Sequence, residues 1–123
     1  ATAYANLEGR GMFKGWAPEA LQAYVDFALR DSDDGGVALK CRPSRESDLF
    51  GSYPRRLWAA LAKLRTPMKI ECGAGSYPFV AASAKRLAAS QPMVRIEQVP
   101  GGHCYMQEDP PAAARRVRAF LLG

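Results

Sequence analysis

Residues 67–103 read PMKIECGAGSYPFVAASAKRLAASQPMVRIEQVPGGH, and their pattern predicts the fold class of the chain. Residues 68–72 form a short strand-like run that ends at a glycine, and residues 93–99 alternate as a second strand does. Between them, residues 79–89 place apolar side chains at helical spacing. A strand, a crossover helix and another strand imply parallel pairing, so the sequence predicts an α/β fold.

One more helix follows this unit. Asp109 is followed by two prolines, which is typical of a helix start because an acid caps the first turn and proline fits there. We expect this helix to end near Leu122. Its expected inward face consists of Ala113, Val117, Phe120 and Leu121, and its expected solvent-exposed residues are Arg115, Arg116 and Arg118. Sites in parallel sheets form after the strand ends, so residues 73–78 and 100–108 are the candidate loops.

The N-terminal half has a less regular pattern. The first sixteen residues contain three glycines and are predicted to be a loop. A helix is expected from Pro18, and the acidic and glycine-rich residues 31–36 end it in a turn. The apolar stripe of this helix is Leu21, Tyr24, Val25, Ala28 and Leu29.

Further along, residues 37–41 are predicted to be a short extended piece. Residues 44–54 are predicted to be irregular, with one helical turn around residues 46–50. A strong helix is expected from Arg55 to about Leu64, since its apolar residues lie on one face.

The composition and charge of the chain argue against two classes of protein, those that bind nucleic acids and those that span a membrane. The chain has 123 residues and a formal net charge of +5, but its basic residues are scattered and interleaved with acids. Because no strip of basic and aromatic residues is present, we expect no nucleic-acid binding. No apolar run approaches the roughly 20 residues that span a bilayer, so no membrane span is expected.

The three cysteines argue against a metal or disulfide framework. Cys41, Cys72 and Cys104 are widely spaced and form no CxxC pair, and a single histidine cannot complete a usual zinc site. We therefore expect reduced thiols in a cytoplasmic protein and no metal.

The two candidate loops carry a recognisable pattern. Residues 67–73 read proline, strand, glycine, and residues 99–103 read Val-Pro-Gly-Gly-His, followed by Glu108 and Pro110. This pattern resembles the last two strands of the α/β-hydrolases, with His103 in the place of their catalytic histidine. The spacing from His103 through Glu108 to Pro110 is its most specific part.

The upstream region is similar to the cap of those family members that have a helical lid, through residues 15–21 and 36–41. The resemblance covers nearly the whole chain but only about the last half of such an enzyme. The predicted fold class is therefore the C-terminal part of an α/β-hydrolase: parallel strands with crossover helices and a helical cap segment. The predicted domains are a cap or lid region, 1–66, and a β-α-β-α part of the hydrolase core, 67–123.

The resemblance implies a nucleophile, a histidine and an acid that converge at the top of the sheet. His103 would take a proton from the nucleophile or from water and return it to the leaving group, which an imidazole does readily near neutral pH. The alternative is that Gly-Gly-His is only a turn. The family's Gly-x-Ser-x-Gly nucleophile elbow occurs nowhere in the 123 residues, so we expect the nucleophile upstream of Ala1.

The usual acid is also absent from the loop after the penultimate strand. Ser76 or Tyr77 lies near the position where an Asp is expected, and Ser76 is a candidate hydrogen-bond partner of His103. Plain loop chemistry is the alternative for Ser76. Glu71 lies inside the strand and would point away, and Cys104 is more consistent with a packed thiol than with a nucleophile.

Aromatic residues suggest a substrate pocket for a small apolar molecule. Trp16, Phe50 and Trp58, together with Tyr53, would line it beneath the cap, with core or lid packing as the alternative. Glu46 is expected to be a surface or cap-anchoring residue, with a polar contact inside the active site as the alternative. Glu108 is expected to stabilise the last helix rather than to take part in the reaction.

The first hypothesis is therefore a hydrolase of the carboxylic-ester type without metal or organic cofactor. Hydrolysis of an epoxide or a carbon–halogen bond would instead use an Asp nucleophile. The alternative is a non-catalytic remnant that acts as a binding or interaction module. In either case the exposed sheet edge leads us to expect association with the chain's own N-terminal half or a homodimer.

Overall fold

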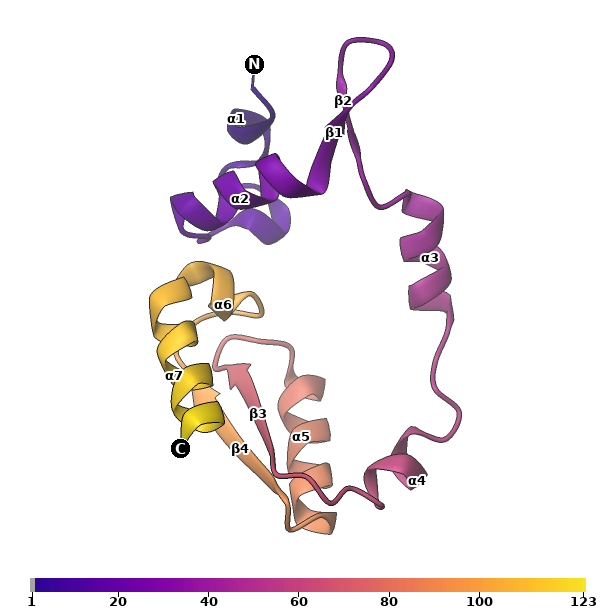
Figure 1. Ribbon diagram of the computed structural model, residues 1–123, viewed down its shortest axis with the longest axis vertical. Helices are drawn as coiled ribbons and strands as arrows, with labels where there is room; N and C mark the ends of the chain where they lie inside the picture. Colours follow the sequence, from indigo (N-terminus) through magenta and orange to yellow (C-terminus); the bar gives the residue numbers. More distant parts are fainter. Residues whose placement is uncertain (1) are drawn as a thin grey trace. The chain divides into compact units, whose positions relative to one another are not determined.

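The computed structural model describes residues 2–123 and divides the chain into two compact units, Ala1–Arg55 and Arg56–Gly123. Each unit contains its own two-stranded sheet, and Figure 1 gives the helices and strands in chain order. Within residues 2–123, no helix has both the length and the apolar character that crossing a membrane requires.

The first unit is mainly helical. Its elements are α1 (Ala3–Leu7), the 3-10 turn η1 (Gly11–Phe13), α2 (Pro18–Ala28), β1 (Leu29–Asp31), β2 (Val37–Leu39) and α3 (Pro43–Gly51). Helix α2 confirms the predicted helix, with proline in its first turn and Glu19 beside it. The predicted stripe packs inward, and Leu21 in it is 2% exposed.

The prediction of a loop over the first sixteen residues is wrong, because two short helical segments lie there. The Thr2 hydroxyl accepts a hydrogen bond from the Ala5 N–H and caps α1, at 3.4 Å. Gly9, Gly11 and Gly15 all have positive φ. These glycines form the turns around the helical segments. The glycine pattern therefore predicted the positions of the turns correctly, but it gave no indication of the helices between them.

Strand β2 confirms the extended piece predicted from Val37, and it pairs antiparallel with β1. Strand β1 was not predicted, because the helical pattern continues through Leu29. The helical turn predicted around residues 46–50 lies within α3, but the prediction that the rest of residues 44–54 is irregular is wrong, since α3 spans most of this segment. All residues of α3 are exposed. The helix therefore buries no apolar stripe, and the sequence lacks the periodic pattern that would have predicted it.

The second unit contains the predicted strand, helix, strand and helix. Its elements are α4 (Leu57–Leu61), β3 (Met68–Gly73), α5 (Pro78–Ser90), β4 (Val94–Val99), α6 (Tyr105–Glu108) and α7 (Pro110–Leu122). Strands β3 and β4 are parallel, in a register from Met68↔Val94 to Gly73↔Val99, which confirms the predicted pairing. Helices α5 and α7 lie on opposite sides of the strand pair (Figure 1).

Helix α4 is shorter than predicted, and a buried glutamine closes it. Gln91 is 5% exposed, and its side-chain amide donates to the Leu61 carbonyl at 3.1 Å. This contact satisfies a carbonyl at the helix end that has no partner within the helix. It also ties α4 to the second unit, so the compact unit begins before the predicted boundary at residues 66/67. The assignment of residues 1–66 to a cap remains a prediction.

The core of the second unit is small. Its buried apolar residues are Cys72, Ala84, Leu87, Val94, Val99 and Ala113. The predicted inward face of α7 is wrong beyond Ala113, since Val117 is 50% and Leu121 69% exposed. Two strands provide too little surface to cover that side of the helix.

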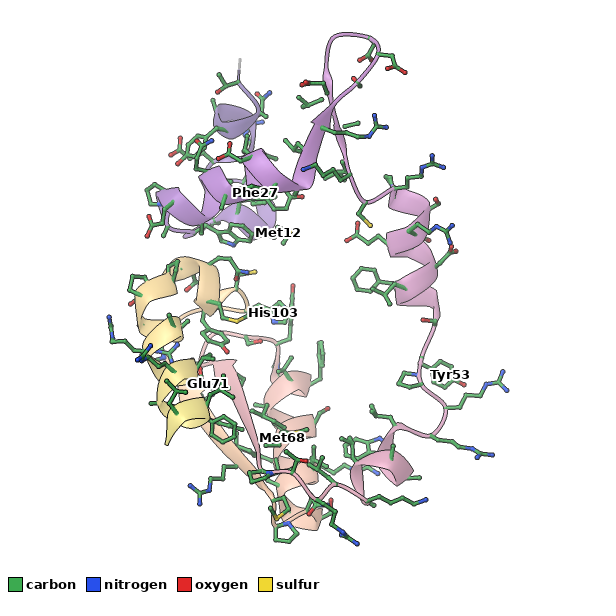
Figure 2. The ribbon with its side chains drawn as sticks, in the orientation of Figure 1. Met12, Phe27, Tyr53, Met68, Glu71 and His103 are labelled. Carbon is green, nitrogen blue, oxygen red and sulfur yellow. The ribbon has the colours of Figure 1, made fainter. Side chains whose placement is uncertain are left out.

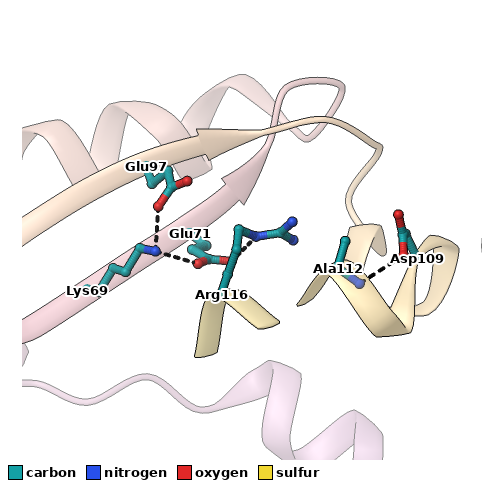
Figure 3. Close-up of polar contacts among 6 residues, drawn as sticks. All are labelled: Lys69, Glu71, Glu97, Asp109, Ala112 and Arg116. Atoms are coloured by element: carbon teal, nitrogen blue, oxygen red, sulfur yellow. Dashed lines mark hydrogen bonds and ion pairs between the residues drawn. The ribbon is translucent and has the colours of Figure 1, made fainter. Parts of the chain in front are cut away.

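Arg116 was expected in water, but it lies in a charged cluster on the strand pair, shown in Figure 3. The Glu71 carboxylate pairs with Arg116 at 3.0 Å and with Lys69 at 2.8 Å, and Lys69 also pairs with Glu97. Burial acts to raise the pKa of Glu71, but hydrogen bonds from Lys69 and Arg116 outweigh it and hold this pKa below its ordinary 4.5. The same contacts, first that with Glu71, raise the pKa of Lys69.

Candidate functional site

The two loops that follow β3 and β4 touch each other through their backbones. The Ala74 N–H donates to the Val99 carbonyl, and the Gly75 N–H to the Gly101 carbonyl, both at 2.8 Å. A Cβ placed on Gly73 would lie 1.9 Å from the Gly102 carbonyl oxygen, a distance that no side chain permits. Glycine at position 73 is therefore what lets the two loops come together at the carboxyl end of the sheet.

This contact brings together the two residues predicted for the site. Ser76, on the loop after β3, places its Oγ 2.8 Å from Nδ1 of His103, on the loop after β4. Ser76 is half-buried and His103 is exposed. The hydroxyl engages Nδ1, and the other ring nitrogen, Nε2, has no hydrogen-bond partner among residues 2–123.

An aromatic pair lies beside His103 and was not predicted from the sequence. The rings of Tyr77 and His103 are 4.9 Å apart, and Tyr77 stacks on Phe79 at 5.6 Å with nearly parallel planes. Tyr77 is 58% and Phe79 66% exposed. The sequence gave little indication that Tyr77 and Phe79 form a pair, because they lie on either side of Pro78 at the start of α5.

Two acidic residues that follow His103 in the sequence accept hydrogen bonds from backbone amides. Both carboxylate oxygens of Glu108 accept from the Gly102 N–H, at 3.0 and 2.9 Å. Asp109 accepts from the Ala112 N–H at 2.9 Å and caps α7, as predicted from the sequence (Figure 3). Glu108 was expected to stabilise the last helix, but its carboxylate contacts the histidine loop instead.

Within residues 2–123, none of the other candidate groups forms a hydrogen bond with His103. Glu71 is held by Lys69 and Arg116, as expected for a strand residue that points away from the loops. Cys104 is half-buried and Cys72 is buried, and both are free thiols. Within residues 2–123, no carboxylate contacts His103, and no three His, Cys, Asp or Glu side chains gather in a way that would hold a metal ion.

The predicted pocket residues lie in separate surroundings. Trp16 packs edge-on against Phe13 and Tyr24, with ring centroids 5.0 and 6.0 Å away. Phe50 is 82% exposed on α3, and Trp58 lies under the Arg86 guanidinium at 4.3 Å. Their role in binding substrate stays a prediction.

Tyr53 and Glu46 are exposed. A cavity of about 790 Å³ lies at the other end of the strand pair, against Met68, Met93 and Phe120. Figure 2 shows Met68 at the start of β3 and His103 beyond the opposite end of the strands. This cavity is therefore separate from the candidate site.

No protein-family model matches the chain, and no curated protein sequence does. Among solved structures, the chain is similar to a crystal structure of E-2-(acetamidomethylene)succinate hydrolase, with a TM-score of 0.77 and 19% sequence identity. The similarity covers 98% of this chain and 44% of that protein, so the chain spans less than half of the hydrolase it matches.

At this identity the similarity shows the fold. The chain has the α/β fold of the C-terminal part of an α/β-hydrolase, with parallel strands and a crossover helix. The fold predicted from residues 67–103 is thereby confirmed.

Proposed function

We propose that this chain carries the catalytic histidine of an α/β-hydrolase that cleaves carboxylic esters. The observation that supports the proposal most is the 2.8 Å contact between Ser76 Oγ and His103 Nδ1, across the two loops at the carboxyl end of the strands. In the family that the sequence resembles, these loops hold the acid and the histidine. Ser76 stands where the acid is expected and makes the contact that an acid would make.

In the proposed reaction, His103 Nε2 takes the proton of the nucleophile and then returns it to the leaving group. A covalent acyl intermediate is released when His103 activates a water molecule in the same way. Ser76 accepts from Nδ1–H and so keeps the lone pair on Nε2. A hydroxyl carries no charge, so it stabilises the imidazolium less than a carboxylate does.

The nucleophile comes from outside these 123 residues, which contain no Gly-x-Ser-x-Gly elbow. We propose that it lies in an N-terminal half of the hydrolase, which also covers the bare side of this unit. Among residues 2–123, strand β3 pairs with β4 alone, and Leu121 and Leu122 on α7 are 69% and 71% exposed. Such an edge and such a surface favour association with that half or, without it, a homodimer.

The substrate we propose is a small apolar ester, with Trp16, Phe50 and Trp58 as pocket residues and no metal or organic cofactor. The matched hydrolase is described as acting on E-2-(acetamidomethylene)succinate, so an acyl amide belongs among the substrates to test. We place the protein in the cytoplasm, because its three thiols are unpaired and a reducing compartment keeps them so.

The test is hydrolysis of 4-nitrophenyl acetate by the chain assembled with a nucleophile-bearing N-terminal half. Replacing His103 with Ala should lower kcat by at least about a hundredfold, and free imidazole should restore part of the activity. The isolated chain should show no hydrolysis that depends on His103. If His103→Ala kept full activity in the assembled enzyme, the proposal would be wrong.

One observation favours a second function, a non-catalytic binding module: no carboxylate contacts His103 within residues 2–123. A remnant without catalytic activity would tolerate loss of the acid. It would remain inactive with any N-terminal half, and Ser76→Asp would not change that. Activity that increases in Ser76→Asp would exclude this alternative.

A further inference from the structure

The loop that carries His103 is held from two sides. On one side it packs on the loop after β3, through the Gly75 N–H that donates to the Gly101 carbonyl at 2.8 Å. On the other side the Glu108 carboxylate binds the Gly102 N–H with both oxygens. The Gly101 carbonyl and the Gly102 N–H belong to the same peptide unit, and Gly102 directly precedes His103. Both contacts therefore fix the backbone immediately before His103.

The two glycines before His103 leave space for this carboxylate because they have no side chains. A Cβ on Gly102 would lie 2.7 Å from one Glu108 oxygen, and a Cβ on Gly101 would lie 2.7 Å from the other. Gly101 also has a φ of +109°, which side-chain-bearing residues rarely adopt. The carboxylate therefore occupies the space that two side chains would otherwise fill.

The same carboxylate closes a short ring around His103. Glu108 is linked back to Cys104 by its own backbone, since its N–H donates to the Cys104 carbonyl at 3.1 Å in α6. Its side chain reaches Gly102, on the other side of His103. A charged acceptor makes a stronger hydrogen bond than a neutral one, so this ring resists opening.

We infer that Glu108 is a positioning residue, which holds the His103 loop through the Gly102 amide without touching the reacting atoms. The catalytic part of this inference rests on the proposed function. The positioning part stands on the contacts of Glu108 alone and can be tested separately.

The matched control is the neighbouring carboxylate, Asp109, which caps α7 but does not contact the histidine loop. The variants are Glu108→Ala, Glu108→Gln and Asp109→Ala in the full 123-residue chain. Hydrogen exchange is measured at the Gly102 amide, and ¹⁵N NMR at the ring of His103, the chain's single histidine. Both alanine variants lose some stability, but a purely structural role for Glu108 would leave the His103 ring signals unchanged.

Glu108→Ala should speed exchange at Gly102 by about tenfold or more and shift the His103 ring nitrogens. Glu108→Gln keeps one acceptor oxygen and should lie between Glu108→Ala and the parent, whereas Asp109→Ala should change neither signal. In the assembled enzyme, Glu108→Ala should lower kcat roughly tenfold to a hundredfold with little change in KM.

The inference is overturned if Gly102 exchange and the His103 ring signals in Glu108→Ala match those in Asp109→Ala. It is also overturned if the two variants lower kcat equally. If the exchange and ring signals change as expected but no histidine-dependent hydrolysis occurs, the positioning contact stands and the proposed function fails.

Discussion

Replacing Gly73 with Ala should disrupt the approach of the two loops that builds the candidate site. The new Cβ would lie 1.9 Å from the Gly102 carbonyl oxygen, whereas ordinary contact begins at 3.4 Å. One backbone must therefore move by the difference, about 1.5 Å. A shift of that size breaks the hydrogen bonds that Ala74 and Gly75 donate across the loops at 2.8 Å.

The expected cost follows from these losses. Two backbone hydrogen bonds contribute about 0.5–1.5 kcal/mol each, and a forced local shift costs about 1–3 kcal/mol. The lower chain entropy of unfolded alanine offsets about 0.4–1 kcal/mol. The free energy of unfolding should thus fall by about 1–6 kcal/mol, with a central value of about 3 kcal/mol. A loss of that central size lowers Tm by roughly 10 °C or more in a unit of this size.

Urea denaturation followed by far-UV circular dichroism measures this change. A graded variant is Gly75→Ala, whose Cβ would lie 3.3 Å from the Gly101 carbonyl oxygen and should cost at most about 1 kcal/mol. The control is Gly51→Ala at the end of α3, where a Cβ meets nothing within 4 Å and should be neutral or slightly stabilising. Equal stability of Gly73→Ala and Gly51→Ala would show that the approach of the two loops does not require glycine at position 73.

Three further predictions concern the charged cluster, the histidine contact and the aromatic pair. Glu71→Gln should lower stability by about 1–2 kcal/mol at pH 7. Because ion pairing depresses the pKa of Glu71 below 4.5, this stabilisation is present above that value and is lost as the pH falls through the depressed pKa. Denaturation curves of parent and variant should therefore converge under acidic conditions, and a difference independent of pH would contradict this. Ser76→Ala should reduce kcat of the assembled enzyme roughly threefold to tenfold, while Ser76→Asp should raise kcat above that of the parent; a lower kcat in the Asp variant would count against Ser76 as the acid's substitute. Phe79→Ala should change stability by less than about 1 kcal/mol yet raise KM for a phenyl ester more than for an ethyl ester, and equal changes in KM would exclude a role for the aromatic pair in binding.

The sequence predicts the second unit well, because its strands and its crossover helix carry regular patterns. Strand β3 ends at Gly73 and β4 at Val99, both as predicted. The contact between Ser76 and His103 could also be proposed, since parallel strands bring their carboxyl ends to one edge.

Other features depend on contacts that no local pattern encodes. Helix α3 is exposed throughout, so periodicity could not separate it from a loop. Arg116 looked solvated, because its partner Glu71 lies far away in the sequence. The role of Glu108 was hidden for a similar reason: a carboxylate near a helix start looks like a dipole partner, and only the folded loop brings Gly102 to it.

The proposed role of His103 as the catalytic base is tested by the rate of 4-nitrophenyl acetate hydrolysis. This rate is measured for the chain with and without a nucleophile-bearing N-terminal half, each compared with His103→Ala. We predict hydrolysis only in the combination, its loss in His103→Ala, and partial recovery when imidazole is added. Hydrolysis by the combination that is unchanged in His103→Ala would show that His103 has no part in the reaction.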